Sequence, residues 1–292
     1  MPAADPVFST LAPYAALLLG LVVGSFLNVV ILRLPRHMHD ELAASCADLH
    51  GEPVEPVSNR LFGLDYLIHP PSTCPQCGHG IRAWENIPVL SYLLLRGRCS
   101  NCKTPISVRY PIIEGVTGLL SLLVALHFGA TSTALVALVL VWTLITLTVI
   151  DLDEQLLPDQ LTLPLVWLGL LVNINGMFTD LTSAVIGAAA GYLSLWLVFQ
   201  VFRLITGREG MGYGDFKLLA VFGAFLGWQL LPLVVLLSSL LGAVVGITLI
   251  VVRGRDRQIP IPFGPYLAAA GLVALLWGEQ INRSYLQLAG LG

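Results

Sequence analysis

The sequence predicts an all-α integral membrane protein with about eight transmembrane helices and a small cytoplasmic insert between the first two. Of its 292 residues, 56% are hydrophobic and only 11% are charged, whereas soluble domains carry roughly 25% charged residues. The mean hydropathy is +0.81. The apolar residues gather in runs close to the ~20 residues that a bilayer-spanning helix requires. Composition therefore argues against a soluble globular fold.

The first apolar run covers residues 11–32 and is predicted to be a transmembrane helix within residues 1–34. It is longer than the apolar core of a signal peptide, which has roughly 7–15 residues and follows basic residues. Residues 1–10 contain no Lys or Arg. Asn28 lies in the second half of the run, where an amide more often hydrogen-bonds to a neighbouring helix than takes part in catalysis.

Residues 35–110 form the predicted insert, because their composition is too polar for a membrane span. The stretch from Arg33 to Arg109 holds eight of the fifteen basic residues and all five cysteines. It is long enough for a small folded unit. Within it, residues 37–60 are predicted to be loop, and no chemistry is assigned to them.

Seven further spans are predicted in residues 111–292, where the apolar runs resume. They cover residues 112–128, 133–150, 161–178, 183–204, 216–230, 232–252 and 263–281. Glycines at positions 223, 227, 242 and 246 permit breaks or close packing in the spans at 216–230 and 232–252. Small residues such as Gly187 and Gly191 are predicted to lie where helices pack closely.

The basic residues predict the orientation of these spans. Eight spans place fourteen of the fifteen Lys and Arg residues on one side of the membrane, with Arg283 on the other. The positive-inside rule makes the basic side cytoplasmic, so the insert is expected inside and both termini outside a bacterial inner membrane. No ionisable residue lies at the middle of a predicted span, where transporters usually bind ions or substrate. The pattern favours chemistry at the cytoplasmic face over transport.

The cysteines predict a metal site in the insert. Two C-x2-C units, separated by 21 residues, are formed by Cys74, Cys77, Cys99 and Cys102. The separation slightly exceeds the usual spacing of roughly 15–20 residues, but four such thiolates can close a tetrahedral zinc site. The alternatives are disulfides, which are rare in a reducing cytoplasm, and four unrelated thiols, although two C-x2-C units by chance are rarer still. Because four thiolates fill the coordination sphere, we expect one structural zinc per chain. Cys46 has no partner in this pattern and is predicted to be a free thiol.

Two aspartates at cytoplasmic helix ends are the candidate catalytic residues. Asp215 follows a glycine-rich stretch between two apolar runs, and Asp151 is the first ionisable residue after an uninterrupted apolar helix. If these carboxyls approach each other, like charge prevents both from ionising, so that one keeps its proton while the other deprotonates a water. The alternative is that both lie in solvated loops, with Asp159 capping the next helix.

The residues around Asp215 form the predicted active-site loop. Gly212 and Gly214 leave room for an extended substrate backbone beside the aspartate. Lys217 is open to three interpretations: it steadies a substrate carboxylate, it tunes Asp215, or it is a cytoplasmic anchor of the membrane helix.

Five motifs, in a shared order, make the sequence resemble the type IV prepilin peptidases, bacterial inner-membrane aspartic enzymes with a Gly-x-Gly-Asp motif. They are residues 24–35, the paired cysteines, residues 109–114, residues 151–159 and residues 212–217. Gly-x-Gly-Asp alone is a weak signal, but the five together are very specific. No departure from the family pattern removes a functional position.

The resemblance implies a bifunctional enzyme. Members of this family cut the basic leader from type IV prepilins and from pseudopilins of type II secretion, then methylate the new N-terminus with S-adenosylmethionine. By motif matching, Asp151 and Asp215 are the catalytic pair, and the four paired cysteines are the metal-binding tetrad. The chain would then divide into a first helix, 1–34, a methyltransferase-associated insert, 35–110, and a seven-helix aspartic peptidase domain, 111–292.

The methyl-donor site carries no recognisable motif. No strand followed by Gly-x-Gly-x-x-Gly is found, so no cofactor-binding residue is assigned. The expected partners are prepilin and pseudopilin substrates and the lipid bilayer, with no nucleic acid. The alternative function is a non-enzymatic membrane scaffold or transporter whose zinc knuckles recruit a partner. Among enzymes, the alternative is a preflagellin-type or presenilin-like protease, which is not expected to carry the cysteine insert.

Overall fold

The computed structural model describes residues 6–50, 65–208, 210–253 and 261–288. The chain divides into two compact units, residues 1–146 and 147–292. Over the described residues the structure is helical, with no β-strand and two isolated β-bridges in the insert. The predicted all-α class is therefore confirmed.

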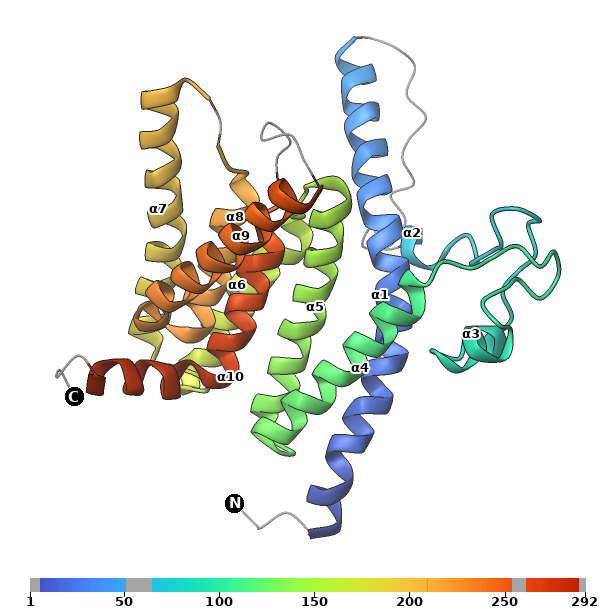
Figure 1. Ribbon diagram of the computed structural model, residues 1–292, viewed down its shortest axis with the longest axis horizontal. Helices are drawn as coiled ribbons and strands as arrows, with labels where there is room; N and C mark the ends of the chain where they lie inside the picture. Colours follow the sequence, from blue (N-terminus) through green and yellow to red (C-terminus); the bar gives the residue numbers. More distant parts are fainter. Residues whose placement is uncertain (1–5, 51–64, 209, 254–260, 289–292) are drawn as a thin grey trace. The chain divides into compact units, whose positions relative to one another are not determined.

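The first unit is built on two long helices, α1 (Pro6–Leu49) and α4 (Arg109–Phe128), which pack along each other (Figure 1). Small residues bring them together. A Cβ added at Gly24 would lie 2.8 Å from the Glu114 Cα, and one at Gly118 would lie 2.9 Å from the Leu21 side chain. Such close contact increases the van der Waals attraction between the two helices, which matters in a bilayer because the hydrophobic effect does not drive helices together there.

The helix α1 is longer than predicted. Residues 37–49, expected to be loop, continue the helix, so the predicted boundary at residue 34 lies within α1. Residues 36–49 contain no further proline and no glycine, and they include three Ala and two Leu, which favour a helix. Residues 51–60 lie outside the described residues.

The insert between α1 and α4 has little regular structure. Its helical pieces are α2 (Asp65–Ile68), the 3-10 turn η2 (Ala83–Asn86) and α3 (Leu90–Leu94). Arg33 of α1 fastens its start, because the guanidinium donates to the carbonyl oxygens of Tyr66, Leu67 and Pro70 at 2.7–3.1 Å. The helix α5 (Ser132–Glu154) follows α4 and runs from the first unit into the second.

The second unit is arranged around α8 (Tyr213–Leu226), in which nearly every residue from Asp215 onward is buried. The remaining long helices of this unit are α6 (Asp159–Val172), α7 (Leu181–Thr206), α9 (Leu231–Arg253) and α10 (Gly264–Leu288). Two short 3-10 turns complete it, η3 (Asn173–Asn175) and η4 (Trp228–Leu230).

Glycines set the closest helix contact of this unit. A Cβ at Gly191 would lie 2.7 Å from the Leu219 carbonyl oxygen, and a Cβ at Gly223 would overlap the backbone of Gly187. The predicted close packing at Gly187 and Gly191 is confirmed. Of the glycines that permit a break or close packing, Gly227 lies at a break, because α8 ends at Leu226 and Gly227 takes a positive φ of 79°. The helix α9 continues through Gly242 and Gly246.

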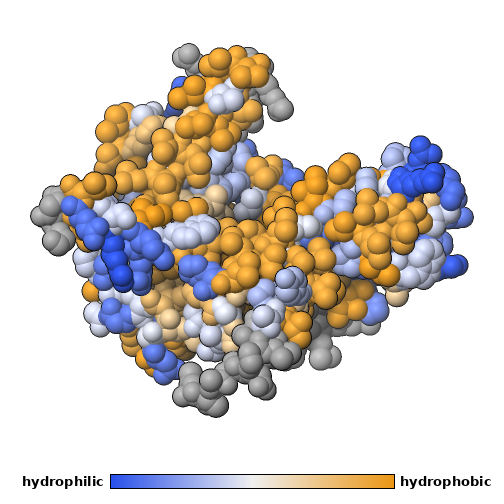
Figure 2. Space-filling model, turned by 60° about the horizontal axis from the view of Figure 1, so that its bottom comes forward, coloured by the Kyte–Doolittle hydropathy of each residue, from blue (hydrophilic) through white to orange (hydrophobic). Residues whose placement is uncertain are grey.

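Within the part of the chain that the structure describes, five helices are long and apolar enough to cross a membrane. They are the part of α1 from Thr10, α4, α5, α7, and residues 228–252 around α9. Exposed leucines line α7, and apolar side chains cover much of the face in Figure 2. The helices α6 and α8 have 14 residues each, about 21 Å at roughly 1.5 Å per residue, against a ~30 Å hydrocarbon core. Each of the eight predicted runs contains a helix, although α6 ends at Val172 within the run 161–178 and the run 216–230 is interrupted at Gly227. A count of eight spans stays a prediction.

Candidate active site and metal centre

The Asp151 carboxyl is buried in the last turn of α5, with 5% of the residue exposed. Its Oδ2 accepts a hydrogen bond from the backbone N–H of Gly264, the first residue of α10, at 3.0 Å. A Cβ added at Gly264 would lie 2.6 Å from the same oxygen. The N-terminus of α10 therefore holds this carboxyl in place, and the absence of a side chain at Gly264 makes that approach possible.

Asp215 lies in the first turn of α8 and is 7% exposed. Leu157 lies beside both acids. A Cβ added at Gly214, next to Asp215, would lie 2.6 Å from the Leu157 Cβ, and one added at Gly264, against the Asp151 carboxyl, would lie 3.4 Å from the Leu157 Cδ1. The two acids are therefore near each other inside the second unit. Asp153 and Asp159, the neighbouring acids of the same loop, are exposed. Depth therefore separates Asp151 from the other acids of its loop, as the sequence suggested.

The two loop glycines differ in their surroundings. A Cβ at Gly212, the N-cap of α8, would meet nothing closer than the Asp215 Oδ2 at 3.9 Å. A Cβ at Gly214 would lie 2.6 Å from the Cβ of Leu157. Gly212 thus borders open space next to the acid, whereas Gly214 allows α8 to pack on the loop before α6.

Lys217 forms an ion pair with Asp159. Its Nζ donates to both carboxylate oxygens, at 2.6 and 2.8 Å, and joins the N-termini of α6 and α8. The interpretation of Asp159 as a helix cap is wrong. Pro158 is the N-cap and Asp159 is the first helical residue. The Asp159 carboxylate accepts from Lys217 and does not cap the helix N–H groups.

The four paired cysteines meet at one point of the insert. Their Sγ atoms lie within 4.8 Å of one another, and the Cys74 and Cys102 sulfurs are 3.8 Å apart. A tetrahedral ion with metal–sulfur bonds of about 2.3 Å places its ligands about 3.8 Å apart. Four thiols in this geometry fit a metal ion. Cys46 is a free, exposed cysteine on α1 and is not part of the cluster.

Two similar turns build the cluster. In the first, the Cys74 carbonyl accepts the N–H of Gly78 while the Cys74 N–H donates to the His79 carbonyl. In the second, the Cys99 carbonyl accepts the N–H of Lys103 while the Cys99 N–H donates to the Thr104 carbonyl. Gly78 and Lys103 both take a left-handed φ, of 67° and 61°. The local sequence thus folds each C-x2-C unit into a tight knuckle that aims its two thiols the same way.

Two family models match the chain. The bacterial peptidase A24 N-terminal domain matches residues 18–128, and the type IV leader peptidase family matches residues 138–247. A prepilin leader peptidase/N-methyltransferase of Pseudomonas aeruginosa is 56% identical over 274 residues, which is 94% of this chain and 93% of that protein. Those of Aeromonas hydrophila and Legionella pneumophila are 56% and 46% identical, over 92% of each chain.

The chain belongs to the prepilin leader peptidase/N-methyltransferase family. No solved structure matches it. The two buried aspartates lie within the part that matches the type IV leader peptidase model, and the cysteine cluster lies within the part that matches the N-terminal domain model. The family resemblance read from the sequence is therefore confirmed.

Sequence reasoning missed one contact of Asp151, the backbone of Gly264. Its N–H contacts Asp151 across 113 positions of the chain. The available signal was the Pro-Phe-Gly-Pro segment, residues 262–265, which opens the last apolar run. The predicted helix contact of Asn28 is confirmed, because its amide donates to the Tyr110 carbonyl of α4 at 3.3 Å and to the Gly24 carbonyl of α1 at 3.2 Å.

Proposed function

We propose that this protein cuts the basic leader from type IV prepilins and from pseudopilins of type II secretion, and then methylates the new N-terminus. The observation that carries the proposal is the pair of buried aspartates, Asp151 and Asp215, in a chain 56% identical to a prepilin leader peptidase/N-methyltransferase. Two acids that lie together out of water are the arrangement that aspartic proteases use to activate a water molecule.

In this mechanism the two carboxyls share one proton. One carboxylate takes a proton from the water, whose oxygen attacks the carbonyl carbon of the scissile bond. The other carboxyl gives its proton first to the carbonyl oxygen, and the leaving nitrogen is protonated as the C–N bond breaks. The Gly264 N–H supports this scheme because it holds one oxygen of Asp151 in a fixed orientation.

The reaction is proposed to take place at the cytoplasmic face of a bacterial inner membrane, which the chain crosses about eight times. A leader rich in Lys and Arg stays cytoplasmic while the apolar helix that follows lies in the bilayer. The scissile bond between them then rests at the membrane surface, the depth expected of Asp151 and Asp215. Gly212, which borders open space, leaves room there for the substrate backbone.

The insert is proposed to hold one structural zinc and to belong to the methyl-transfer half of the enzyme. Four sulfurs at tetrahedral spacing support zinc, which prefers four-coordinate thiolate sites and needs no open position when it is structural. S-adenosylmethionine supplies the methyl group. Residues 111–292 are assigned to the peptidase half.

The deciding experiment incubates the purified full-length protein with a prepilin and S-adenosylmethionine, then weighs the N-terminus of the product. We expect loss of the leader followed by a gain of one methyl group. Cleavage that survives the loss of both aspartates would instead point to a membrane scaffold or transporter with a contaminating protease.

A further inference from the structure

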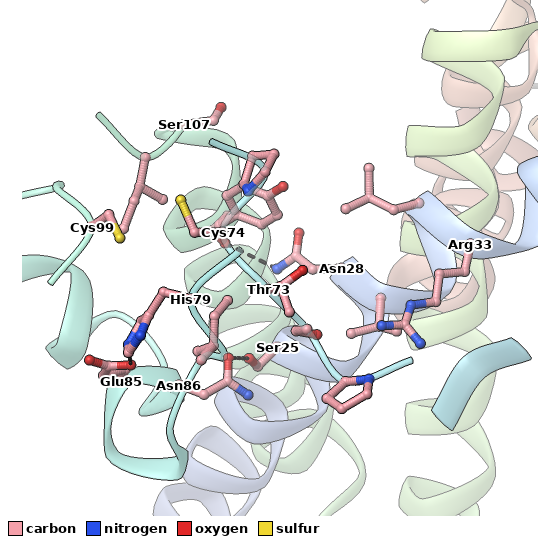
Figure 3. Close-up of a pocket in the computed structure, with 18 of the residues that line it drawn as sticks. Ser25, Asn28, Arg33, Thr73, Cys74, His79, Glu85, Asn86, Cys99 and Ser107 are labelled. Atoms are coloured by element: carbon pink, nitrogen blue, oxygen red, sulfur yellow. Dashed lines mark hydrogen bonds and ion pairs between the residues drawn. The ribbon is translucent and has the colours of Figure 1, made fainter. Parts of the chain in front are cut away.

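The first unit contains a large cavity between α1, the start of α4 and the insert. Its volume is about 1330 Å³, and its lining includes Ser25, Asn28, Arg36, Asn86 and Glu114. Figure 3 shows Ser25 and Asn28 of α1 turned toward the segment of the insert that carries Thr73 and Cys74. Pockets for one small molecule measure roughly 300–1,000 Å³, so this cavity has room for a nucleoside and the end of a peptide together.

Glu114 is a buried acid of the cavity that has no cationic partner among the described residues. The residue is 8% exposed, and its Oε2 accepts the backbone N–H of Val89 at 2.8 Å. Among the described residues, no cationic side chain forms an ion pair with it. An ionised carboxylate accepts about four hydrogen bonds, and a buried one without a cation costs several kcal/mol. The site therefore suits a ligand that brings a positive charge.

The other charged groups of the cavity are already engaged or exposed. Glu85 accepts the Arg82 N–H at 2.9 Å and lies 3.4 Å from the His79 ring. The Arg33 guanidinium donates hydrogen bonds to three backbone carbonyls at the start of the insert. Asp40 and Arg36 lie at the exposed rim. A cation that enters the cavity thus meets Glu114 as the buried acid with free acceptor capacity.

We propose that this cavity is the methyl-transfer site and that Glu114 binds the α-ammonium group of S-adenosylmethionine. The inference rests on the proposed methyltransferase activity and names the residue that would hold the donor. The donor is a sulfonium nucleoside with an amino-acid end, and the acceptor is the neutral N-terminal amine of the cleaved substrate.

The charge balance of the reaction decides which end of the donor Glu114 holds. The amine lone pair forms the N–C bond, the C–S bond breaks, and its electron pair goes to sulfur, so the positive charge moves from sulfur to nitrogen. A carboxylate beside the sulfur would stabilise the starting state more than the transition state and would slow the step. The ammonium keeps its charge throughout, so binding there holds the donor without this penalty.

The scaffold around Glu114 is rigid. Asn28 ties α1 to the Tyr110 carbonyl one turn before Glu114, and Gly24 allows α1 to reach the Glu114 backbone. Asn28 is therefore a positioning residue, and the carboxyl is held in place before the donor arrives.

The test measures binding of S-adenosylmethionine, and of its demethylated product, to the full-length protein in detergent by isothermal titration calorimetry. We expect Glu114→Gln to raise the dissociation constant about 10–100-fold, because a charge-assisted hydrogen bond is lost while the shape is kept. The control is Glu41→Gln, which removes an exposed acid of α1 outside the cavity and should leave binding unchanged.

A second variant keeps the inference testable if Glu114→Gln fails to fold. Ser91 of α3 lines the cavity, so Ser91→Trp places a bulky ring there while the Glu114 side chain is kept, and it should also abolish binding. Metal content reports whether the insert of each variant is folded. Wild-type affinity in Glu114→Gln with its metal retained would overturn the assignment. If Glu114→Gln loses its metal, wild-type affinity in Ser91→Trp would overturn it instead.

The same measurements separate this inference from the proposed function. Wild-type protein that methylates a pre-cleaved substrate, together with unimpaired donor binding in Glu114→Gln, refutes the inference alone. A wild-type protein that cleaves prepilin but never methylates it refutes the proposed methyl transfer.

Discussion

The backbone N–H of Gly264 donates to the Oδ2 of Asp151 at 3.0 Å, and a Cβ at Gly264 would lie 2.6 Å from that oxygen. The last helix of the chain thus orients an acid that lies 113 positions earlier. Because both the hydrogen bond and the missing side chain are needed, this glycine is a sensitive position of the second unit.

Gly264→Ala should therefore impair cleavage more than stability. The new methyl group displaces the Asp151 carboxyl, and a misplacement of about 1 Å can lower an enzymatic rate roughly 100-fold. The measurement is the initial rate of prepilin cleavage in detergent. Gly246→Ala is the matched control, since its Cβ would meet Ile261 at an ordinary 3.6 Å. Equal rates for the two variants would argue against an orienting role for Gly264.

Asp151→Asn and Asp215→Asn should each abolish cleavage while the protein stays folded. An amide has nearly the same shape as a carboxyl but cannot accept the proton, and loss of general acid–base catalysis costs roughly 100–10,000-fold. Asp153→Asn is the control, because Asp153 is exposed on the same helix and should retain most activity. Loss of activity in Asp153→Asn, with Asp151→Asn active, would show that the wrong acid of this loop was chosen.

The ion pair between Lys217 and Asp159 should contribute modestly. Asp159 is half exposed, with 51% of its side chain accessible, and exposed pairs are worth about 0.2–1 kcal/mol. Lys217→Met and Asp159→Asn should each lower cleavage by less than about fivefold, and the double variant should be no worse than either single one. A far larger loss in Lys217→Met than in Asp159→Asn would mean that the lysine has a role beyond this pair.

Removal of the metal should loosen the insert and leave the helices intact. We expect about one zinc per chain in purified protein, and loss of zinc in Cys77→Ser with faster proteolysis within residues 65–108. A chelator should reproduce the proteolysis pattern in the wild type. Cys46→Ser should behave like the wild type, because Cys46 is not part of the cluster. Full metal content in Cys77→Ser would contradict the zinc assignment.

Asn173→Leu should destabilise the second unit. The Asn173 amide donates to the carbonyls of Ala224 and Phe225, and its oxygen accepts the N–H groups of Phe178 and Thr179. Loss of this buried side chain leaves several backbone groups unpaired, at about 1–3 kcal/mol each. Thermal unfolding in detergent should show a clearly lower midpoint.

Asn175→Leu is the matched control for that measurement, because Asn175 is exposed two residues later in the same turn. An equal shift in the two variants would show that leucine in this turn is harmful in itself. The four hydrogen bonds of Asn173 would then contribute little.

The cysteine cluster and the positions of most helices were predictable because they depend on local sequence. A C-x2-C unit folds into its knuckle through contacts within six residues, and apolar runs become helices because unpaired backbone groups are too costly in lipid. The error at residues 37–49 has the same origin. The polarity of this segment favours a loop, although a polar segment without glycine or proline continues a helix as well as it forms a loop.

By itself, the sequence determined the all-α class, the family motifs, the cysteine tetrad and the choice of Asp151 and Asp215 as candidate acids. Only the tertiary structure decided that these acids lie close together, that Gly264 orients Asp151, and that Lys217 pairs with Asp159. The physical reason is sequence distance. Each of these relationships joins helix ends dozens of residues apart, and side-chain packing in the folded protein decides which ends meet.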